Sequence, residues 1–143
     1  MSAKGKLKFI GTTTRSSDDT SQITIFPEYR EALEGLTAFS HIIILYWLHL
    51  NDTEEKRSIL KITPKRHKGA PEVGVFASRS PVRPNPIGLS ICELLEIKNG
   101  TLTVRDFDAV EGTRIIDIKP YIPRADSIPD ARAPSWTLEG PKT

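Results

Sequence analysis

The sequence contains very little cysteine and no long apolar run. The single cysteine, Cys92, lies in an apolar stretch, which predicts a packed, reduced thiol and no disulfide bond. The longest apolar run, residues 42–48, is far shorter than the roughly 20 residues that a membrane-spanning helix needs. No basic segment followed by an apolar one marks the N-terminus as a signal peptide. We therefore expect a soluble cytoplasmic protein that does not associate with membranes.

Nucleotide-binding motifs and metal-ligand clusters are also missing. The chain has neither a Gly-x-Gly-x-x-Gly sequence nor a Walker sequence, which argues against a Rossmann or P-loop site. His41 and His49 would lie about 26 Å apart on one face of an extended strand, too far to share a metal. With one cysteine and no tight histidine cluster, a zinc site is not expected.

Charge is balanced overall but uneven along the chain. The formal net charge is +2, yet residues 61–83 contain one acid, Glu72, and six basic side chains: Lys61, Lys65, Arg66, Lys68, Arg79 and Arg83. Such a basic strip suits a phosphate backbone and makes Lys65, Arg66 and Lys68 candidate nucleic-acid contacts. The alternative is a solvated lysine-rich loop.

Most of the remaining pattern indicates short strands. Residues 21–26 alternate, so that Ile23 and Ile25 should share a buried face. Asn99-Gly100 predicts a hairpin between strands 87–98 and 101–107. Pro27 should open one short helix that ends near Gly35. Further strands are expected at residues 6–14, 40–50, 57–63, 73–77 and 113–119, with a polar turn at 16–21 and a basic loop at 64–71.

Residues 40–50 form the strongest predicted strand, with apolar side chains on both faces, and we expect it to be central. From Pro120 onward the composition predicts an irregular tail, held by Trp136. The sequence therefore predicts a mainly β, barrel-like single domain over residues 1–143, antiparallel or mixed, with one short helix and no Rossmann fold.

Residues 74–93 contain the most informative stretch of the chain. Residues 79–86 carry two arginines and three prolines, and each proline keeps the residue before it out of the helical region. A stiff, non-helical arm with two guanidinium groups is suited to gripping an anion. The alternative is a rigid surface loop whose arginines are only solvated.

Residues 74–90 read Gly-Val-Phe-Ala-Ser-Arg-Ser-Pro-Val-Arg-Pro-Asn-Pro-Ile-Gly-Leu-Ser. This stretch resembles the signature of the TsaA-like (TrmO-like) S-adenosylmethionine-dependent tRNA methyltransferases, in their short single-domain, archaeal-type form, and departs from it only at Ser78, where the family has threonine. Residues 106–112 and 117–123 are similar to two further family segments, with Phe107 and Glu111 as mild departures. The resemblance implies the TsaA-like (YaeB-like) β-barrel fold and a homodimer.

The resemblance also implies roles for individual residues. The cofactor contacts would be His49, Leu50, Arg79, Leu89, Asp108, Ala109, Val110 and Glu111. Substrate alignment and proton handling would involve Arg83, Asn85, Asp117, Lys119 and Tyr121. On composition alone, turn chemistry also explains Asp108 and Gly112. Asp117 and Lys119 could equally form a surface ion pair, worth about 0–1 kcal/mol.

The function implied by the resemblance is methylation of the exocyclic nitrogen of threonylcarbamoyl-adenosine beside the tRNA anticodon. Two departures bear on it: only residues 16–22 remain of a cofactor-contacting loop found in many members, and we expect the chain to lack the second domain into which bacterial members extend. Two other functions stay open: a non-catalytic RNA-binding module, and a methyltransferase that acts on another small substrate.

Overall fold

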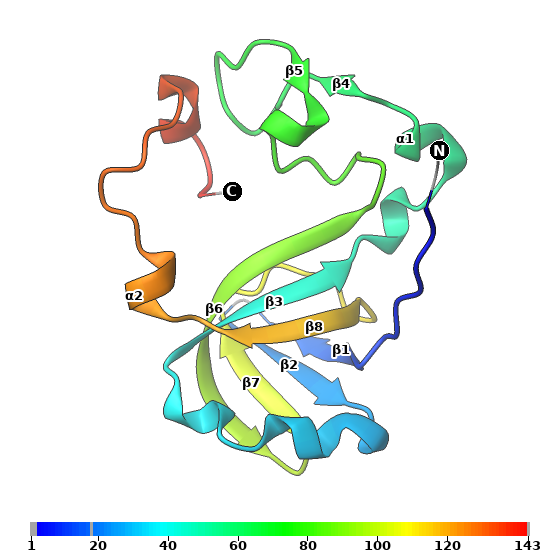
Figure 1. Cartoon of the computed structure of the whole chain (residues 1–143), viewed down its shortest axis with the longest axis vertical. Helices are drawn as coiled ribbons and strands as arrows, with labels where there is room; N and C mark the ends of the chain where they lie inside the picture. The colour runs from blue at the N-terminus through cyan, green and yellow to red at the C-terminus, as the bar shows by residue number, and fades with distance from the viewer. Residues whose placement is uncertain (1–2, 18, 143) are drawn as a thin grey trace. The chain divides into compact units, whose positions relative to one another are not determined.

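Six strands close into a barrel in the computed structural model, which describes residues 3–17 and 19–142 (Figure 1). They are β1 (Gly11–Ser16), β2 (Thr20–Ile25), β3 (His41–Trp47), β6 (Ile87–Lys98), β7 (Thr101–Arg105) and β8 (Arg114–Pro120). Their order around the barrel is β1-β2-β7-β6-β3-β8. The pairs β1–β2, β1–β8, β2–β7, β3–β8 and β6–β7 are antiparallel. The predicted mainly β, barrel-like fold is confirmed.

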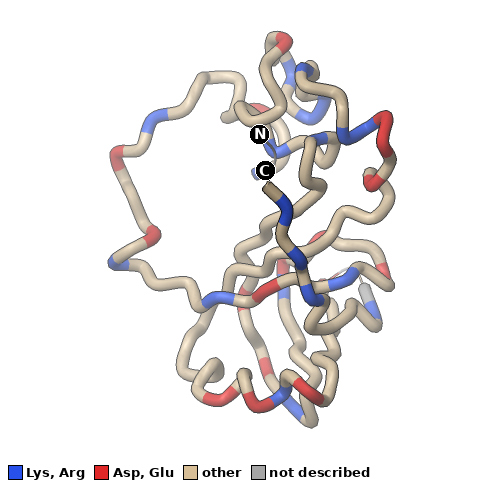
Figure 2. The backbone as a smooth tube through the Cα atoms, turned by 45° about the vertical axis from the view of Figure 1, so that its right-hand side comes forward, with Lys and Arg blue, Asp and Glu red and all other residues tan. Residues whose placement is uncertain are grey.

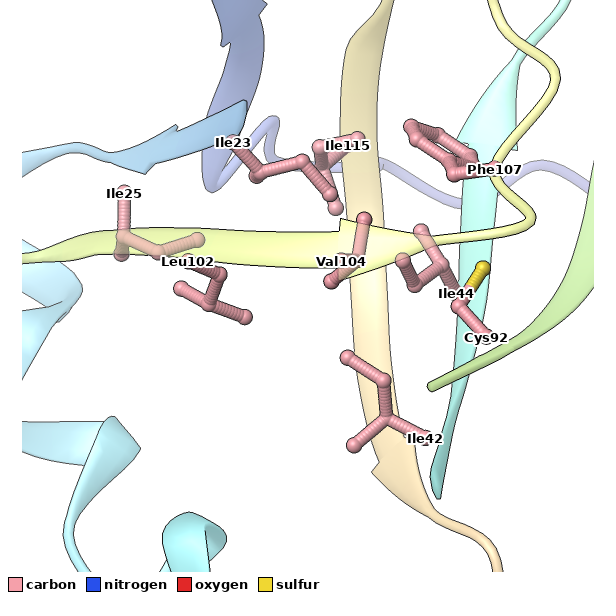
Figure 3. Close-up of a cluster of buried hydrophobic side chains, with 9 residues drawn as sticks. All are labelled: Ile23, Ile25, Ile42, Ile44, Cys92, Leu102, Val104, Phe107 and Ile115. Carbon is pink, nitrogen blue, oxygen red and sulfur yellow. The ribbon is translucent and has the colours of Figure 1, made fainter. Parts of the chain in front are cut away.

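Alternation along the strands fills the barrel with apolar side chains. In β2 every second residue is buried, and Ile23 and Ile25 are 0% and 1% exposed, as their spacing predicts. Figure 3 shows them with the rest of the core: Ile42, Ile44, Cys92, Leu102, Val104, Phe107 and Ile115. Because closing the sheet removes its edges, every strand has two neighbours. The strand β3 lies between β6 and β8, but the closed barrel has no edge strand, so the predicted central position does not distinguish β3 from the other strands.

Two predicted turns have the expected backbone. Asn99 and Gly100 both have positive φ, 51° and 74°, and connect β6 to β7 in a two-residue hairpin. The predicted helix is present as the 3-10 helix η1 (Pro27–Leu33). Gly35 follows it with φ of 87° and precedes η2 (Leu36–Ala38). The expectation of a single helix is wrong, because several further short helical turns occur.

Several predicted strands differ from the structure; among them, the predicted strand 40–50 is His41–Trp47 and the predicted strand 101–107 ends at Arg105. β1 begins at Gly11 rather than at residue 6, because its partner β2 ends at Ile25, just before Pro27 turns the chain. Residues 57–63 contain only β4 (Lys61–Ile62), since Thr53 caps the short helix α1 (Glu54–Arg57) by accepting a hydrogen bond from the Lys56 amide.

Residues 73–77 contain only β5 (Val73–Gly74), which pairs antiparallel with β4. The chain then turns into the 3-10 helix η4 (Val75–Ala77), in which Val75 is buried and Phe76 is 80% exposed. The tail holds α2 (Pro123–Asp126) and η5 (Ser135–Leu138). The strand interpretation failed here because an apolar run this short fits a buried helical turn equally well.

The chain divides into two compact units. The first contains the described residues up to Trp47 together with Gly88–Pro123, and the second contains Leu48–Ile87 together with the described residues from Arg124 onward. The single-domain interpretation stays a prediction. Within residues 3–17 and 19–142, no helix is long and apolar enough to cross a membrane.

Candidate functional site

The candidate residues fall into both units. The first unit contains eight of them: Leu89, Asp108, Ala109, Val110, Glu111, Asp117, Lys119 and Tyr121. The second unit contains the other eight: His49, Leu50, Lys65, Arg66, Lys68, Arg79, Arg83 and Asn85.

In the second unit, the arm over residues 79–86 is held by its own side chains. The Ser78 hydroxyl accepts a hydrogen bond from the Ser80 amide at 3.2 Å, and the Ser80 hydroxyl accepts one from the Val82 amide at 3.1 Å. Arg83 Nη1 donates to the carbonyl oxygens of Ser78 and Ser80, both at 3.0 Å. The arm is non-helical as predicted, and these local bonds add to the stiffness that its prolines supply.

The two arginines of the arm therefore differ. Arg83 is half-buried and uses one guanidinium nitrogen to bind the backbone of the arm. Arg79 is exposed, directly after the turn that follows η4. The resemblance assigned Arg79 to the cofactor and Arg83 to the substrate, and in the structure Arg79 is exposed whereas Arg83 bonds to the arm itself.

Arg57 is a residue that the sequence interpretation missed. Its Nε donates to the Pro84 carbonyl at 2.7 Å, and its Nη2 donates to Asn85 Oδ1 at 3.4 Å. Its Nη1 forms an ion pair with Asp52 at 2.9 Å. Asn85 is thus oriented from α1. The Thr53 cap followed by two glutamates was the available sequence signal for α1.

His49 and Leu50 begin the 3-10 helix η3 (His49–Asn51), and both are exposed. The expectation that His41 and His49 share a strand face is wrong, because β3 ends at Trp47 and the Leu48 amide bonds instead to the Pro86 carbonyl at 2.7 Å. No group of three His, Cys, Asp or Glu side chains that could hold a metal occurs in the part of the chain that the structure describes.

In the first unit, the carboxylate-rich loop after β7 is anchored by Phe107. This ring is buried and meets Tyr46 edge-on at 5.1 Å between centroids, and its carbonyl accepts a hydrogen bond from the Ser21 hydroxyl at 3.1 Å. Ala109 is half-buried and packs against the core, while Asp108, Val110 and Glu111 are exposed. The loop thus presents three carboxylates, those of Asp106, Asp108 and Glu111, and one apolar side chain to solvent.

The loop ends in a turn that needs glycine. Gly112 has φ of 90°, and its amide donates to the Thr13 carbonyl at 2.7 Å. An L-residue with a side chain rarely adopts this φ. Turn chemistry therefore accounts for Gly112, as the alternative interpretation predicts, while the side chains of Asp108 and Glu111 in the same loop are exposed.

Asp117 and Lys119 lie side by side on the outer face of β8. Lys119 Nζ is 3.3 Å from Asp117 Oδ2, and the two side chains are 61% and 45% exposed. Asp117 Oδ1 also accepts a hydrogen bond from the Ile118 amide at 2.9 Å. Tyr121 follows, half-buried, with its amide bonded to the His41 carbonyl at 3.0 Å. At this exposure the pair contributes only about 0–1 kcal/mol to stability.

Leu89 lies on β6 and is 45% exposed. The residue before it, Gly88, packs under the ring of Tyr46, and a Cβ atom there would approach that ring to 2.5 Å. The Ser90 hydroxyl donates to the Tyr46 hydroxyl at 3.3 Å. Tyr46 therefore links the signature segment of β6 to Phe107 and to the carboxylate-rich loop, a role that periodicity alone did not reveal.

The basic segment lies between β4 and β5 in the second unit, and Figure 2 marks its Lys and Arg positions in blue. Lys65, Arg66 and Lys68 are exposed, whereas His67 is only 7% exposed. The His67 ring packs against Trp136 at 5.5 Å between centroids, and its Nδ1 donates to the Glu139 carbonyl at 2.6 Å. Trp136 thus holds the C-terminal tail, as predicted.

An open groove of about 1310 Å³ runs through the second unit. It is lined by β4, the basic segment, η4, the start of the arm and the C-terminal segment. Arg79, Lys65 and Arg66 all line it, so the structure brings a predicted cofactor contact together with two predicted tRNA contacts.

Cys92 is excluded as a nucleophile. Burial, together with the nearby charge of Asp106, raises the pKa of its thiol to about 12. The thiol donates to the Asp106 carbonyl at 3.6 Å. This agrees with the prediction of a packed small residue.

Comparisons with known proteins agree with this geometry. The model of the tRNA-methyltransferase O N-terminal domain matches residues 11–127. A probable S-adenosyl-L-methionine-binding protein of Methanothermobacter thermautotrophicus is 49% identical over 116 residues, which cover 80% of this chain and 78% of that protein. The tRNA (adenine(37)-N6)-methyltransferase of Escherichia coli is 45% identical over 107 residues, which cover 72% of this chain and 45% of that protein.

A solved structure has the same fold. A crystal structure of TrmO superposes with a TM-score of 0.72 at 29% identity, over 92% of this chain and 64% of that chain. The chain thus spans under two thirds of this solved protein and under half of the Escherichia coli relative.

Proposed function

Because the chain belongs to the family of the tRNA-methyltransferase O N-terminal domain, we propose that it is an S-adenosylmethionine-dependent methyltransferase that acts on tRNA. The observation that carries the proposal is the family match over residues 11–127, which includes the arm with Arg79 and the loop with Asp108 and Glu111. The relative named as an S-adenosyl-L-methionine-binding protein supports the cofactor.

The residues present fit this cofactor chemically. Its methionyl carboxylate needs a cationic partner, and the exposed guanidinium of Arg79 can supply a bidentate one. Its hydroxyl and ammonium groups need acceptors, which the exposed carboxylates of Asp108 and Glu111 supply in the first unit. Its apolar parts need surface, and Leu50, Leu89 and Val110 are 64%, 45% and 53% exposed.

We retain the whole predicted cofactor set, His49, Leu50, Arg79, Leu89, Asp108, Ala109, Val110 and Glu111, as part of the proposal. When bound, S-adenosylmethionine supplies an electrophilic methyl group on a sulfonium, which a nitrogen lone pair of the acceptor takes as the C–S bond breaks and the nitrogen loses a proton. Alignment of the reactants is the main contribution expected of the protein, up to roughly 7–11 kcal/mol.

Asp117, Lys119, Tyr121 and Asn85 are the proposed aligning and proton-handling residues. Asp117 is the acceptor proposed for the proton, and the hydrogen bond from the Ile118 amide to its Oδ1 helps to hold the carboxylate in place. Lys119 Nζ, 3.3 Å from Oδ2, keeps the carboxylate oriented. The proposed acceptor is the exocyclic nitrogen of threonylcarbamoyl-adenosine next to the anticodon, with Arg83, Lys65, Arg66 and Lys68 as tRNA contacts.

We further propose that the protein works as a homodimer. The outer face of β6 supports this, because Leu89, Ile91 and Leu95 follow one another at every second or fourth position and are 45%, 48% and 39% exposed. Two-fold pairing of identical surfaces is the commonest assembly of small chains.

Calorimetry with S-adenosylmethionine and nucleoside mass spectrometry test the function. Binding heat is expected for the wild-type protein, and nucleosides of tRNA from cells that lack the gene should lose one methyl mark. Absence of binding heat would favour the RNA-binding module. Binding without any change in tRNA nucleosides would favour a methyltransferase that acts on another small substrate.

A further inference from the structure

The groove in the second unit is larger than a site for one small molecule requires. Its volume of about 1310 Å³ exceeds the roughly 300–1,000 Å³ of ordinary small-molecule pockets, and it is open rather than enclosed. A polymer segment that lies along an open groove matches this shape better than a single small ligand does.

The charge of the groove selects a polyanion. Five cationic side chains line it, Lys61, Lys65, Arg66, Arg79 and Lys142, against one acid, Glu72. Lys61 and Lys65 come from the β4 side, Arg79 from the arm and Lys142 from the C-terminal segment, so the positive charge is contributed by more than one stretch of the chain. Cations distributed in this way along a groove follow a phosphate backbone.

An exposed aromatic ring in the same groove adds a second chemistry. Phe76 is 80% exposed, because the turn of η4 buries the neighbouring Val75 and directs Phe76 outward. A phenyl ring makes no charge-assisted contact with a phosphate backbone, whereas an unpaired base can stack on its face. In a duplex the bases are already stacked on each other, so a ring beside cations favours a single strand.

The C-terminal segment completes the groove and lies outside the family match, which ends at residue 127. Ala133, Pro134, Trp136, Thr137 and Lys142 all line the groove. The segment is fixed by the packing of Trp136 on His67 and by the hydrogen bond from His67 to Glu139. Gly140, with φ of 84°, passes so close to the Arg66 carbonyl that a Cβ atom would collide with it. This wall is therefore built into the fold of the second unit.

We propose that this groove binds an unpaired RNA segment, with Phe76 as a base-stacking platform, Lys65 and Lys142 as phosphate contacts, and the C-terminal segment as one wall. The inference rests on the proposed action on tRNA and extends it to a defined surface. Arg79 lines the groove and is also the proposed carboxylate partner of the cofactor, so an RNA strand in the groove passes the residue that holds the methyl donor.

The test is fluorescence polarisation with a fluorescein-labelled single-stranded RNA of about 12 nucleotides, within the range of known site sizes. Phe76→Ala should weaken binding about 5- to 150-fold, the loss expected for one stacked base. Phe76→Trp should retain binding, and Phe76→Leu, which keeps an apolar side chain without an aromatic face, should not. Leu138→Ala is the matched control, because Leu138 is 84% exposed in the C-terminal segment and is not among the residues that line the groove.

Further variants test the basic side chains of the groove and its C-terminal wall separately. Lys65→Ala combined with Lys142→Ala should lower the salt dependence of RNA binding, while Lys98→Ala, at an exposed position in the first unit, should leave it unchanged. Gly140→Ala should displace the C-terminal segment and weaken RNA binding without altering the circular dichroism of the barrel.

Calorimetry with S-adenosylmethionine on the same variants separates this inference from the proposed function. Phe76-dependent RNA binding with unchanged cofactor heat supports the inference. RNA affinity that is unaffected by Phe76→Ala overturns it, even if methyl transfer persists. If Phe76→Ala lost cofactor binding but kept RNA binding, the inference would also be overturned, because the groove would then be the cofactor site. Phe76-dependent RNA binding in a wild-type protein without cofactor heat supports the groove and refutes the methyltransferase.

Discussion

Individual side chains decide which parts of the signature are structural and which are open to a ligand. Arg83 and Arg79 lie four residues apart in the same arm, yet Arg83 bonds to two carbonyl oxygens of the arm and Arg79 is exposed. Hydrogen bonds to the backbone restrict the arm before a ligand binds. Ordering a flexible residue on binding would otherwise cost roughly 1–2 kcal/mol of conformational entropy. Arg83 therefore prepares the arm that presents Arg79.

Replacing Arg79 should weaken cofactor binding strongly while the fold survives. Arg79→Ala is expected to weaken S-adenosylmethionine binding about 10- to 100-fold, because charge-assisted hydrogen bonds to the carboxylate are removed. Arg79→Lys should restore little, since an ammonium group cannot form the bidentate fork. Calorimetry measures both variants, with Arg132→Ala as an exposed control in the same unit. Wild-type affinity in Arg79→Ala would refute the assignment.

The buried thiol of Cys92 should make stability depend on pH at the alkaline end. Its pKa is raised from 9.0 to about 12 by burial, so between these values the unfolded chain has lost a proton that the folded protein keeps. The free energy of unfolding should therefore fall as pH rises through this window and be unaffected by this group below pH 9.

Urea unfolding at about pH 8 and about pH 10.5, on either side of the ordinary thiol pKa, tests this prediction. Cys92→Ala lowers stability at both pH values because it leaves a cavity, but its additional loss at the higher pH should be smaller than that of the wild type. Equal losses in the two proteins would show that the thiol titrates normally.

At the level of elements, β6 connects the signature to the core of the first unit. It carries Gly88, Leu89 and Ser90, and it packs Gly88 and Ser90 against Tyr46 of β3. Tyr46 in turn meets Phe107 at the start of the carboxylate-rich loop. A change at Gly88 is therefore expected to reach Asp108 and Glu111 through ring packing.

Gly88→Ala should be destabilising. The added Cβ would lie 2.5 Å from the ring of Tyr46, so the ring must move, and overpacking of this kind costs about 1–3 kcal/mol. Gly5→Ala is the matched control, because no atom lies within 4 Å of a Cβ placed there. Urea unfolding measures both variants. A Gly88→Ala protein as stable as the wild type would show that Tyr46 can shift freely.

For the molecule as a whole, the net charge is too small to attract a polyanion strongly, and attraction is expected from a local cluster of basic side chains. The net charge is only +2, yet the segment between β4 and β5 exposes Lys65, Arg66 and Lys68. At physiological salt, the Debye length of about 8 Å limits steering by distant charges, so tRNA affinity should depend on this cluster.

The salt dependence of tRNA binding should therefore be reduced in a triple variant. Lys65→Ala, Arg66→Ala and Lys68→Ala together should flatten the slope of log affinity against log salt, by about 0.7–0.9 for each phosphate that is no longer neutralised. Filter binding between low and high salt measures the slope. An unchanged slope and affinity would identify the cluster as solvated surface.

Assembly is tested by light scattering at micromolar concentration, where a dimer is expected. Leu89→Glu and Ile91→Glu on the outer face of β6 should shift the protein toward monomer, because a buried, unpaired charge is costly. An activity test with mixed subunits, Arg79→Ala and Lys119→Ala, should show partial recovery if one site uses both chains. A monodisperse, fully active monomer would contradict the homodimer.

The sequence alone determined the parts of this protein that follow from local rules. Period-two alternation predicted the buried faces of β2, Asn99-Gly100 predicted the hairpin, and three prolines predicted the non-helical arm. The signature at residues 74–90 predicted the family, since a match of that length is highly specific.

Only the tertiary structure decided where some strands end and which contacts chemically similar residues make. The ends of β1 and β3 depend on where their partners stop, which no local pattern contains. Arg83 and Arg79 have the same chemistry but different neighbours, and Arg57 orients Asn85 from 28 positions away in the sequence. The groove joins β4, η4 and a C-terminal segment far along the chain, because packing of Trp136 on His67 brings them together. Contacts between distant residues follow from the folded chain and not from the spacing of its residues.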